Sequence, residues 1–255
     1  MSEILNFPIL MSAAAFLTFW LCGHAGEFIR TRVRQLDEEQ RHDLDVVVTA
    51  TLTLLGLIIG FSFSMAISRY DQRKNLEAEE ANAIGTAYVR ADLLPPIEAE
   101  RVRTLLSNYL HQRIDFYESR DSAHLREVEA GTADLQIKLW ACAKSGAMAR
   151  PTAVTALAVE AMNDTLNSQA YTQAAWWNRI PPPAWALMGF LAICGNLLVG
   201  YSSHRTGPIL LLVLPLALSV AFFLIADIDS PRGGLIRVLP RNLESLSHSI
   251  RQPAP

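Results

Sequence analysis

Small and hydroxyl-bearing residues recur on one side of the apolar segment 46–68. At 100° per residue along a helix, five positions fall on one stripe: Thr49, Thr53, Gly56, Gly60 and Ser64. Small polar side chains can line a wetted pore through a membrane. Gly56 and Gly60 also form a GxxxG pair, extended by Ser64, that lets two helices approach closely. The stripe therefore supports two interpretations, a pore wall and a packing surface.

Bulky apolar residues and then basic residues continue this face beyond the stripe. The candidates for an apolar neck, which would gate by excluding water, are Phe63 and Ile67. Arg73 and Lys74 extend the face past the segment and would place positive charge at the inner mouth of a pore, where it favours anions. Asp71 on the same face dilutes this charge.

The other ionisable residues show no spacing typical of catalysis or metal binding. The six histidines are scattered, and no nucleophile motif, phosphate-binding loop or paired acid–base set is present, so we predict no enzyme, no metal and no cofactor. Three glutamates fit a solvated helical face paired with the basic residues: Glu77, Glu79 and Glu80. Asp227 and Asp229 precede the turn signal Ser230-Pro231 and fit a cap after the last apolar segment.

Four apolar segments without Asp, Glu, Lys or Arg set the architecture: 4–23, 46–68, 182–203 and 207–226. Each has the roughly 20 residues that a helix needs to cross about 30 Å of hydrocarbon. We therefore predict an all-α membrane protein with four transmembrane helices in two hairpins around a large helical insert. The predicted parts are a first hairpin in 1–68, an insert in 69–181, a second hairpin in 182–226 and a tail in 227–255.

The insert has the apolar spacing of helices. Its helices should break at Pro95-Pro96, near 119–122, at Pro151 and at 181–183. Its charges nearly balance, with 13 Lys and Arg against 15 Asp and Glu, which favours a solvated helical bundle. Trp176 and Trp177 precede the third apolar segment and are predicted to anchor in the headgroup layer, with a place in the core as the alternative.

Four spans put the insert and both termini on one side of the membrane. Seven Lys and Arg residues flank the spans on that side and five on the other, so the positive-inside rule predicts a cytosolic insert, although four of the five lie together in the first loop. The net charge is −3 and the chain has no basic stripe, which excludes a nucleic-acid partner.

Three stretches resemble the bacterial bestrophin-like family of membrane proteins: GFSFSMAISRYDQR at 60–73, EANAIGTAYVRADLLP at 80–95 and DIDSPRGGLIR at 227–237. The chain is more distantly similar to the bestrophin anion channels, which share the two hairpins around a helical cytosolic region. That resemblance implies a pentamer in the bacterial plasma membrane whose second span lines the pore. It also implies an apolar neck at Phe63 and Ile67, with Ile59 as a third position. It does not extend to calcium binding, because Asp227 and Asp229 alone are too few for a calcium site of six to eight oxygens.

These observations predict a homo-oligomeric, passive ion channel that prefers anions. Its partners would be further copies of the chain, the lipid bilayer and small inorganic ions. The spans lack the ionisable residues that proton-coupled transporters place inside the membrane. The alternative is a non-conducting membrane scaffold or sensor, in which the stripe only packs and the insert binds a cytosolic protein partner.

Overall fold

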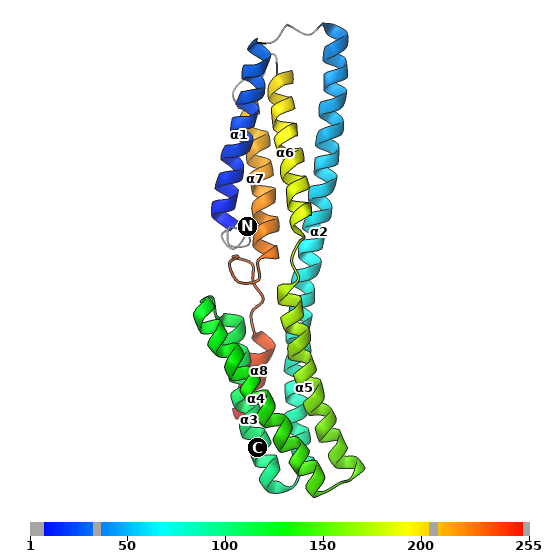
Figure 1. Ribbon diagram of the computed structural model, residues 1–255, viewed down its shortest axis with the longest axis vertical. Helices are drawn as coiled ribbons and strands as arrows, with labels where there is room; N and C mark the ends of the chain where they lie inside the picture. Colours follow the sequence, from blue (N-terminus) through cyan, green and yellow to red (C-terminus); the bar gives the residue numbers. More distant parts are fainter. Residues whose placement is uncertain (1–7, 33–36, 204–208, 252–255) are drawn as a thin grey trace. The chain divides into compact units, whose positions relative to one another are not determined.

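The computed structural model describes residues 8–32, 37–203 and 209–251, and every regular element among them is helical (Figure 1). The elements are α1 Pro8–Arg32, α2 Glu38–Arg90, the short 3-10 helix η2 Ala91–Leu93, α3 Pro96–Glu118, α4 Ser122–Ala149, α5 Ala153–Trp177, α6 Pro182–Ser202, α7 Leu210–Asp229 and α8 Arg241–Arg251. Residues 4–7 of the first predicted span and 207–208 of the fourth lie outside the described residues.

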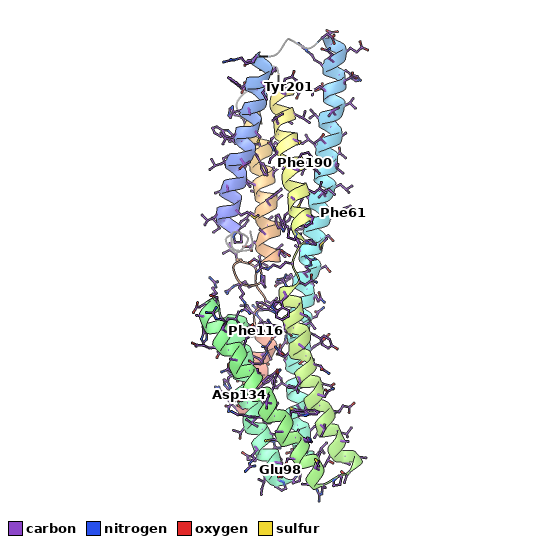
Figure 2. The ribbon with its side chains drawn as sticks, viewed as in Figure 1. Phe61, Glu98, Phe116, Asp134, Phe190 and Tyr201 are labelled. Atoms are coloured by element: carbon purple, nitrogen blue, oxygen red, sulfur yellow. The ribbon has the colours of Figure 1, made fainter. Side chains whose placement is uncertain are left out.

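Four helical stretches among the described residues are long and apolar enough to cross a membrane: Pro8–Arg32, Glu38–Leu93, Ala153–Ser202 and Leu211–Asp229. The predicted all-α membrane protein with four spans is thereby confirmed. Phe61 and Phe190, on two of these stretches, are 61% and 63% exposed, as expected of side chains that face lipid (Figure 2).

Proline sets several helix boundaries, as the sequence predicted. Pro96 and Pro182 open α3 and α6, where a missing N–H costs nothing because the first turn has no intrahelical acceptor for it. The break near 119–122 separates α3 from α4, which begins with the Asp121 carboxylate accepting from the backbone N–H groups of Ala123 and His124. Pro151 separates α4 from α5.

The chain divides into two compact units. Unit 1 comprises residues 1–69 and 179–237, and unit 2 comprises residues 70–178 and 238–255, so α2 contributes to both. In unit 1, α1 packs against α6 and α7 (Figure 1). An edge-to-face contact of 5.4 Å between the rings of Phe19 and Phe222 joins α1 to α7.

Unit 2 is a bundle of α3, α4, α5 and α8 with the last part of α2. The side chains at its centre are almost fully buried and include Ile84, Leu106, Tyr109, Phe116, Leu139 and Met162. Trp176 also belongs to this core, 5% exposed, with its ring 5.1 Å from Phe116 and 5.4 Å from Tyr117. The prediction that Trp176 anchors in the headgroup layer was therefore wrong, and its aromatic neighbours on α3 are the reason.

Candidate functional site

The stripe predicted on the second span lies on an uncovered face of α2. The buried residues of this part of the helix are Leu55, Ser62 and Ala66, on a different side. All five stripe residues are exposed: Thr49, Thr53, Gly56, Gly60 and Ser64. A Cβ added at Gly56 or Gly60 would meet no other atom within 4 Å. The described part of the chain therefore does not use this GxxxG pair for packing.

Close helix packing occurs instead where α1 crosses α6. A Cβ at Gly26 would lie 2.0 Å from the carbonyl oxygen of Leu197, and one at Gly200 would lie 1.9 Å from that of Gly23. The two backbones touch, so no larger side chain fits. The sequence interpretation missed this contact, although the Gly23–Gly26 spacing in the first span was a visible signal.

The two threonine hydroxyl groups of the stripe are satisfied by their own helix. Thr49 Oγ1 donates to the carbonyl of Asp45, and Thr53 Oγ1 donates to that of Thr49, both at 2.8 Å. Threonine in a membrane helix can thus face water or lipid without an unmet donor. The oxygen lone pairs remain available on the exposed side of the helix.

The predicted neck residues lie on or beside the same exposed face. Phe63 and Ile67 are 37% and 38% exposed, and Ile59 is half-buried at the edge of the face. Phe61 is also bulky and exposed but lies roughly 120–160° around the helix from Ile67 and Phe63. The structure thus separates two apolar surfaces of α2, of which only one continues the hydroxyl stripe.

The two basic residues predicted for the inner mouth have different environments. Arg73 is only 2% exposed, whereas Lys74 is exposed. Asp71 and Glu79 are exposed on the same stretch of α2. Two carboxylates therefore accompany one ammonium group on its solvent-facing surface.

A buried ion pair replaces part of the solvated glutamate face. Glu80 is 0% exposed and accepts hydrogen bonds from the Arg113 guanidinium, from Tyr117 Oη at 3.2 Å and from Thr172 Oγ1 at 3.2 Å. Burial alone would lower the pKa of Arg113, but the Glu80 carboxylate outweighs it and raises that pKa. Burial and the same carboxylate raise the pKa of Tyr117, which stays a donor. The predicted solvated face was wrong for Glu80.

Glu77 is buried as well, at 1% exposure, and holds the first turn of α8. Its carboxylate accepts from the backbone N–H of Asn242 at 2.9 Å, from that of Leu243 at 3.0 Å and from Asn242 Nδ2 at 2.5 Å. A carboxylate at a helix N-terminus satisfies unpaired donors and complements the helix dipole. Glu79 alone keeps the solvated position predicted for all three glutamates.

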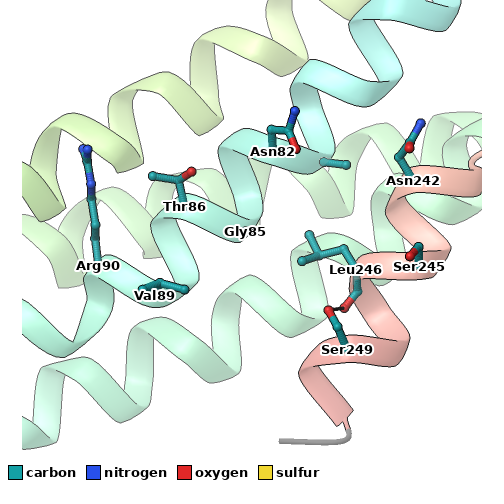
Figure 3. Close-up of a pocket in the computed structure, with 10 residues that line it drawn as sticks. Asn82, Gly85, Thr86, Val89, Arg90, Asn242, Ser245, Leu246 and Ser249 are labelled. Atoms are coloured by element: carbon teal, nitrogen blue, oxygen red, sulfur yellow. Dashed lines mark hydrogen bonds between the residues drawn. The ribbon is translucent and has the colours of Figure 1, made fainter. Parts of the chain in front are cut away.

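A groove of about 610 Å³ opens beside this contact, between α2 and α8 (Figure 3). Hydroxyl and amide groups from both helices line it over an apolar floor that includes Leu246. The polar lining residues are Asn82, Thr86, Arg90, Asn242, Ser245 and Ser249.

Asp227 and Asp229 do not act as a simple cap. Asp227 accepts from the backbone N–H groups of Leu235 and Ile236, and Asp229 accepts from the N–H of Ile180 at 3.1 Å. Arg69 Nη1 lies 3.5 Å from Asp229. Asp229 therefore joins the end of the second span to the chain just before α6. Sequence reasoning missed this because the three segments are far apart along the chain.

The side chains that bind metals do not cluster. Among the residues that the structure describes, no three His, Cys, Asp or Glu side chains come together as a metal site would require. The ionisable clusters are instead engaged in ion pairs and backbone contacts.

A profile of the bestrophin-like domain matches residues 12–243. The chain belongs to the bestrophin-like family. With the apolar stretches described above, this identifies a multi-pass membrane protein. A comparison with curated protein sequences found no match.

Solved structures of a bacterial bestrophin homolog from Klebsiella pneumoniae have the same fold. A single-substitution variant of that homolog gives a TM-score of 0.67 at 12% identity, over 95% of this chain and 97% of the other. The homolog solved by Zn-SAD phasing gives 0.64 at 14% identity, over 95% of both chains. At this identity the likeness shows the bestrophin fold along nearly the whole chain.

Proposed function

We propose that this chain is one subunit of a homo-oligomeric, passive ion channel whose pore is lined by α2. The observation that carries the proposal is the uncovered stripe of Thr49, Thr53, Gly56, Gly60 and Ser64. A Cβ added at either glycine would meet no other atom within 4 Å. One helix cannot enclose a pore, so several copies must supply the wall, and rotational symmetry closes such a ring. Resemblance to the bestrophins makes the expected number five.

The apolar neck of this pore consists of Phe63 and Ile67, with Ile59 at its edge. A ring of such side chains repels water when narrow and conducts when it widens, which is gating by dewetting. Their exposure in the single chain agrees with this role, because pore-lining side chains are not covered by their own subunit.

Anion preference rests on Lys74. Arg73 is buried, so it does not present its charge at an open mouth as the sequence suggested. Lys74 is exposed on the continuation of the pore helix, beside the carboxylates of Asp71 and Glu79. The channel would lie in the bacterial plasma membrane with the insert and both termini in the cytosol. Membership of the bestrophin-like family favours this over an enzyme.

Flux through reconstituted liposomes tests the pore. The variant Phe63→Ala/Ile67→Ala should raise ion flux above that of the unmodified protein, because a smaller apolar side chain widens the neck. Phe61→Ala is the matched control: it removes an equally bulky, exposed side chain from another face of the same helix and should leave flux unchanged. Equal effects of the two variants, or no flux from any of them, would contradict the assignment of the neck.

Reversal potentials in a chloride gradient test the preference for anions. Lys74→Gln should shift the reversal potential toward cations without abolishing conductance, because it removes the exposed positive charge and leaves a neutral polar side chain that is only slightly shorter. An unchanged reversal potential refutes the role of Lys74 and leaves the pore assignment intact.

A second candidate function is a non-conducting scaffold or sensor. The groove between α2 and α8 favours it, since a polar-rimmed groove of about 610 Å³ is large enough to receive part of a cytosolic partner. Absence of flux from every variant, with the oligomer intact, would support this function.

A further inference from the structure

The segment that follows α7, residues 230–237, is folded back onto the end of that helix. The two carboxylate oxygens of Asp227 accept from the N–H groups of Leu235 at 2.7 Å and Ile236 at 2.8 Å. Ser230 Oγ accepts from the N–H of Gly233 at 3.2 Å. We call residues 230–237 the exit loop. Figure 1 shows it directly beyond the end of α7.

Glycine is required where the exit loop touches the helix. A Cβ on Gly234 would lie 2.3 Å from the carbonyl oxygen of Asp227, so the backbone at this point cannot accept any side chain. With the hydrogen bonds to Asp227, this contact fixes the position of the loop relative to the last turn of α7. The backbone of the exit loop is therefore held in one conformation.

The apolar side chains of the exit loop point away from the protein. Leu235 is 74% exposed and Ile236 is 40% exposed, although their backbone N–H groups are held by a buried carboxylate. Leaving such side chains in water is unfavourable, because apolar surface is stabilised by leaving water. Because the fixed backbone of the exit loop keeps both side chains exposed, we expect an apolar environment on the outer side of the loop.

Two arginines lie beside these side chains. Arg232 and Arg237 flank them and are half-exposed, whereas the nearby carboxylates of Asp227 and Asp229 are buried, at 2% and 4% exposure, and accept backbone hydrogen bonds. Exposed apolar residues flanked by arginine are typical of segments that insert shallowly into an anionic membrane surface.

The position of the exit loop at the end of a membrane span indicates that its partner is the membrane. α7 is one of the spans, Asp227 is the first ionisable residue after its apolar run, and Leu235 and Ile236 are bonded to that residue. The loop must therefore lie where hydrocarbon gives way to headgroups. We propose that the exit loop binds the membrane surface, with Leu235 and Ile236 inserted between acyl chains and with Arg232 and Arg237 on the phosphates of anionic phospholipids. This role does not depend on whether the protein conducts ions.

Spin labels at matched sites test the proposal in the full-length protein. The three native cysteines, Cys22, Cys142 and Cys194, are replaced by alanine, and single cysteines are introduced by Leu235→Cys, Ile137→Cys and Leu216→Cys. Ile137 is as exposed as Leu235, at 71%, but lies in unit 2 and serves as the aqueous control; Leu216, inside α7, serves as the lipid control. Each label is read in phosphatidylcholine vesicles with and without phosphatidylglycerol, by its accessibility to oxygen and to a water-soluble nickel chelate.

The label at 235 should resemble the lipid control, with high accessibility to oxygen and low accessibility to nickel. Nickel accessibility equal to that at 137 would overturn the proposal, because the side chain would then lie in water. Low accessibility to both reagents would also overturn it, because the loop would then be covered by protein, such as a second copy of the chain.

A second measurement keeps the native cysteines. Phosphatidylglycerol added to the detergent-solubilised protein should raise the melting temperature of the unmodified chain more than phosphatidylcholine does, because a ligand that binds only the folded state stabilises it. In Arg232→Gln/Arg237→Gln, the affinity for phosphatidylglycerol relative to phosphatidylcholine, obtained from the dependence of the melting temperature on lipid concentration, should fall about 25-fold. Each arginine near an anionic surface contributes about fivefold. An undiminished preference in this variant would refute the role of the arginines.

Discussion

Replacing Glu80 by glutamine should lower the melting temperature of the protein by about 6–20 °C. The side chains of Glu80 and Arg113 are 0% and 1% exposed, so the variant leaves a guanidinium ion in the core of unit 2 without its counter-charge. Breaking a buried ion pair from one side costs about 3–5 kcal/mol. For a chain of this size, each kcal/mol corresponds to about 2–4 °C in melting temperature.

Glutamine keeps the shape of the side chain and one carbonyl oxygen, so Tyr117 and Thr172 can still donate to it. The loss therefore reports the missing charge together with the hydrogen bond from Arg113 Nε, which the amide nitrogen cannot accept. If this reasoning holds, Glu80→Gln/Arg113→Met should melt above Glu80→Gln, because the second substitution removes the uncompensated cation.

Thermal unfolding of the full-length protein in detergent, followed by circular dichroism, measures both effects. Asp134→Asn is the control, since it breaks an ion pair with Lys138 whose side chains are 59% and 56% exposed. An exposed pair contributes at most about 1 kcal/mol, or about 2–4 °C. Equal shifts for Glu80→Gln and Asp134→Asn would refute the reasoning, as would a double variant that melts below Glu80→Gln.

Two further predictions concern glycine packing and a helix cap. Gly200→Ala should destabilise the protein by about 1–3 kcal/mol, because its Cβ would lie 1.9 Å from the carbonyl oxygen of Gly23. Gly56→Ala should leave the melting temperature unchanged. A loss of stability in Gly56→Ala would show that the GxxxG pair packs in the oligomer. The hydrogen bonds from Ala123 and His124 to Asp121 lower its pKa below the ordinary 3.8, so the cap of α4 is complete above that pH and is lost as the pH falls through the lowered pKa. Amide exchange should show the first turn of α4 losing protection only in that acidic range, and the non-titrating cap in Asp121→Asn should abolish this pH dependence.

Helical structure and its breaks followed from local sequence. Proline at 96, 151 and 182 ended or opened helices where expected, because proline lacks a backbone N–H and its ring clashes with the preceding turn. The rule is not absolute, since α7 holds Pro215 in its interior. Apolar length alone predicted the membrane-crossing stretches. The stripe on the second span could also be read directly, since helical periodicity determines which residues share a face.

Periodicity does not say which face another element covers. It grouped Glu77 and Glu80 with solvated residues, but both are buried against partners that are distant along the chain. Arg113, the partner of Glu80, lies 33 positions away, and Asn242, the partner of Glu77, lies 165 positions away. The same limit affected the glycines: Gly26 and Gly200 touch neighbouring backbone, whereas Gly56 and Gly60 do not. Which charges are desolvated, and which small residues meet another helix, depends on segments distant along the chain.

The sequence by itself therefore determined the helices, the apolar stretches that span a membrane and the bestrophin-like family, because each depends on patterns within a short stretch of chain. Only the tertiary structure decided that Arg73 is buried while Lys74 is exposed, and that Asp227 holds the exit loop against the end of α7. Burial depends on what packs against a residue, and an ionisable side chain can be buried only where a distant partner satisfies it.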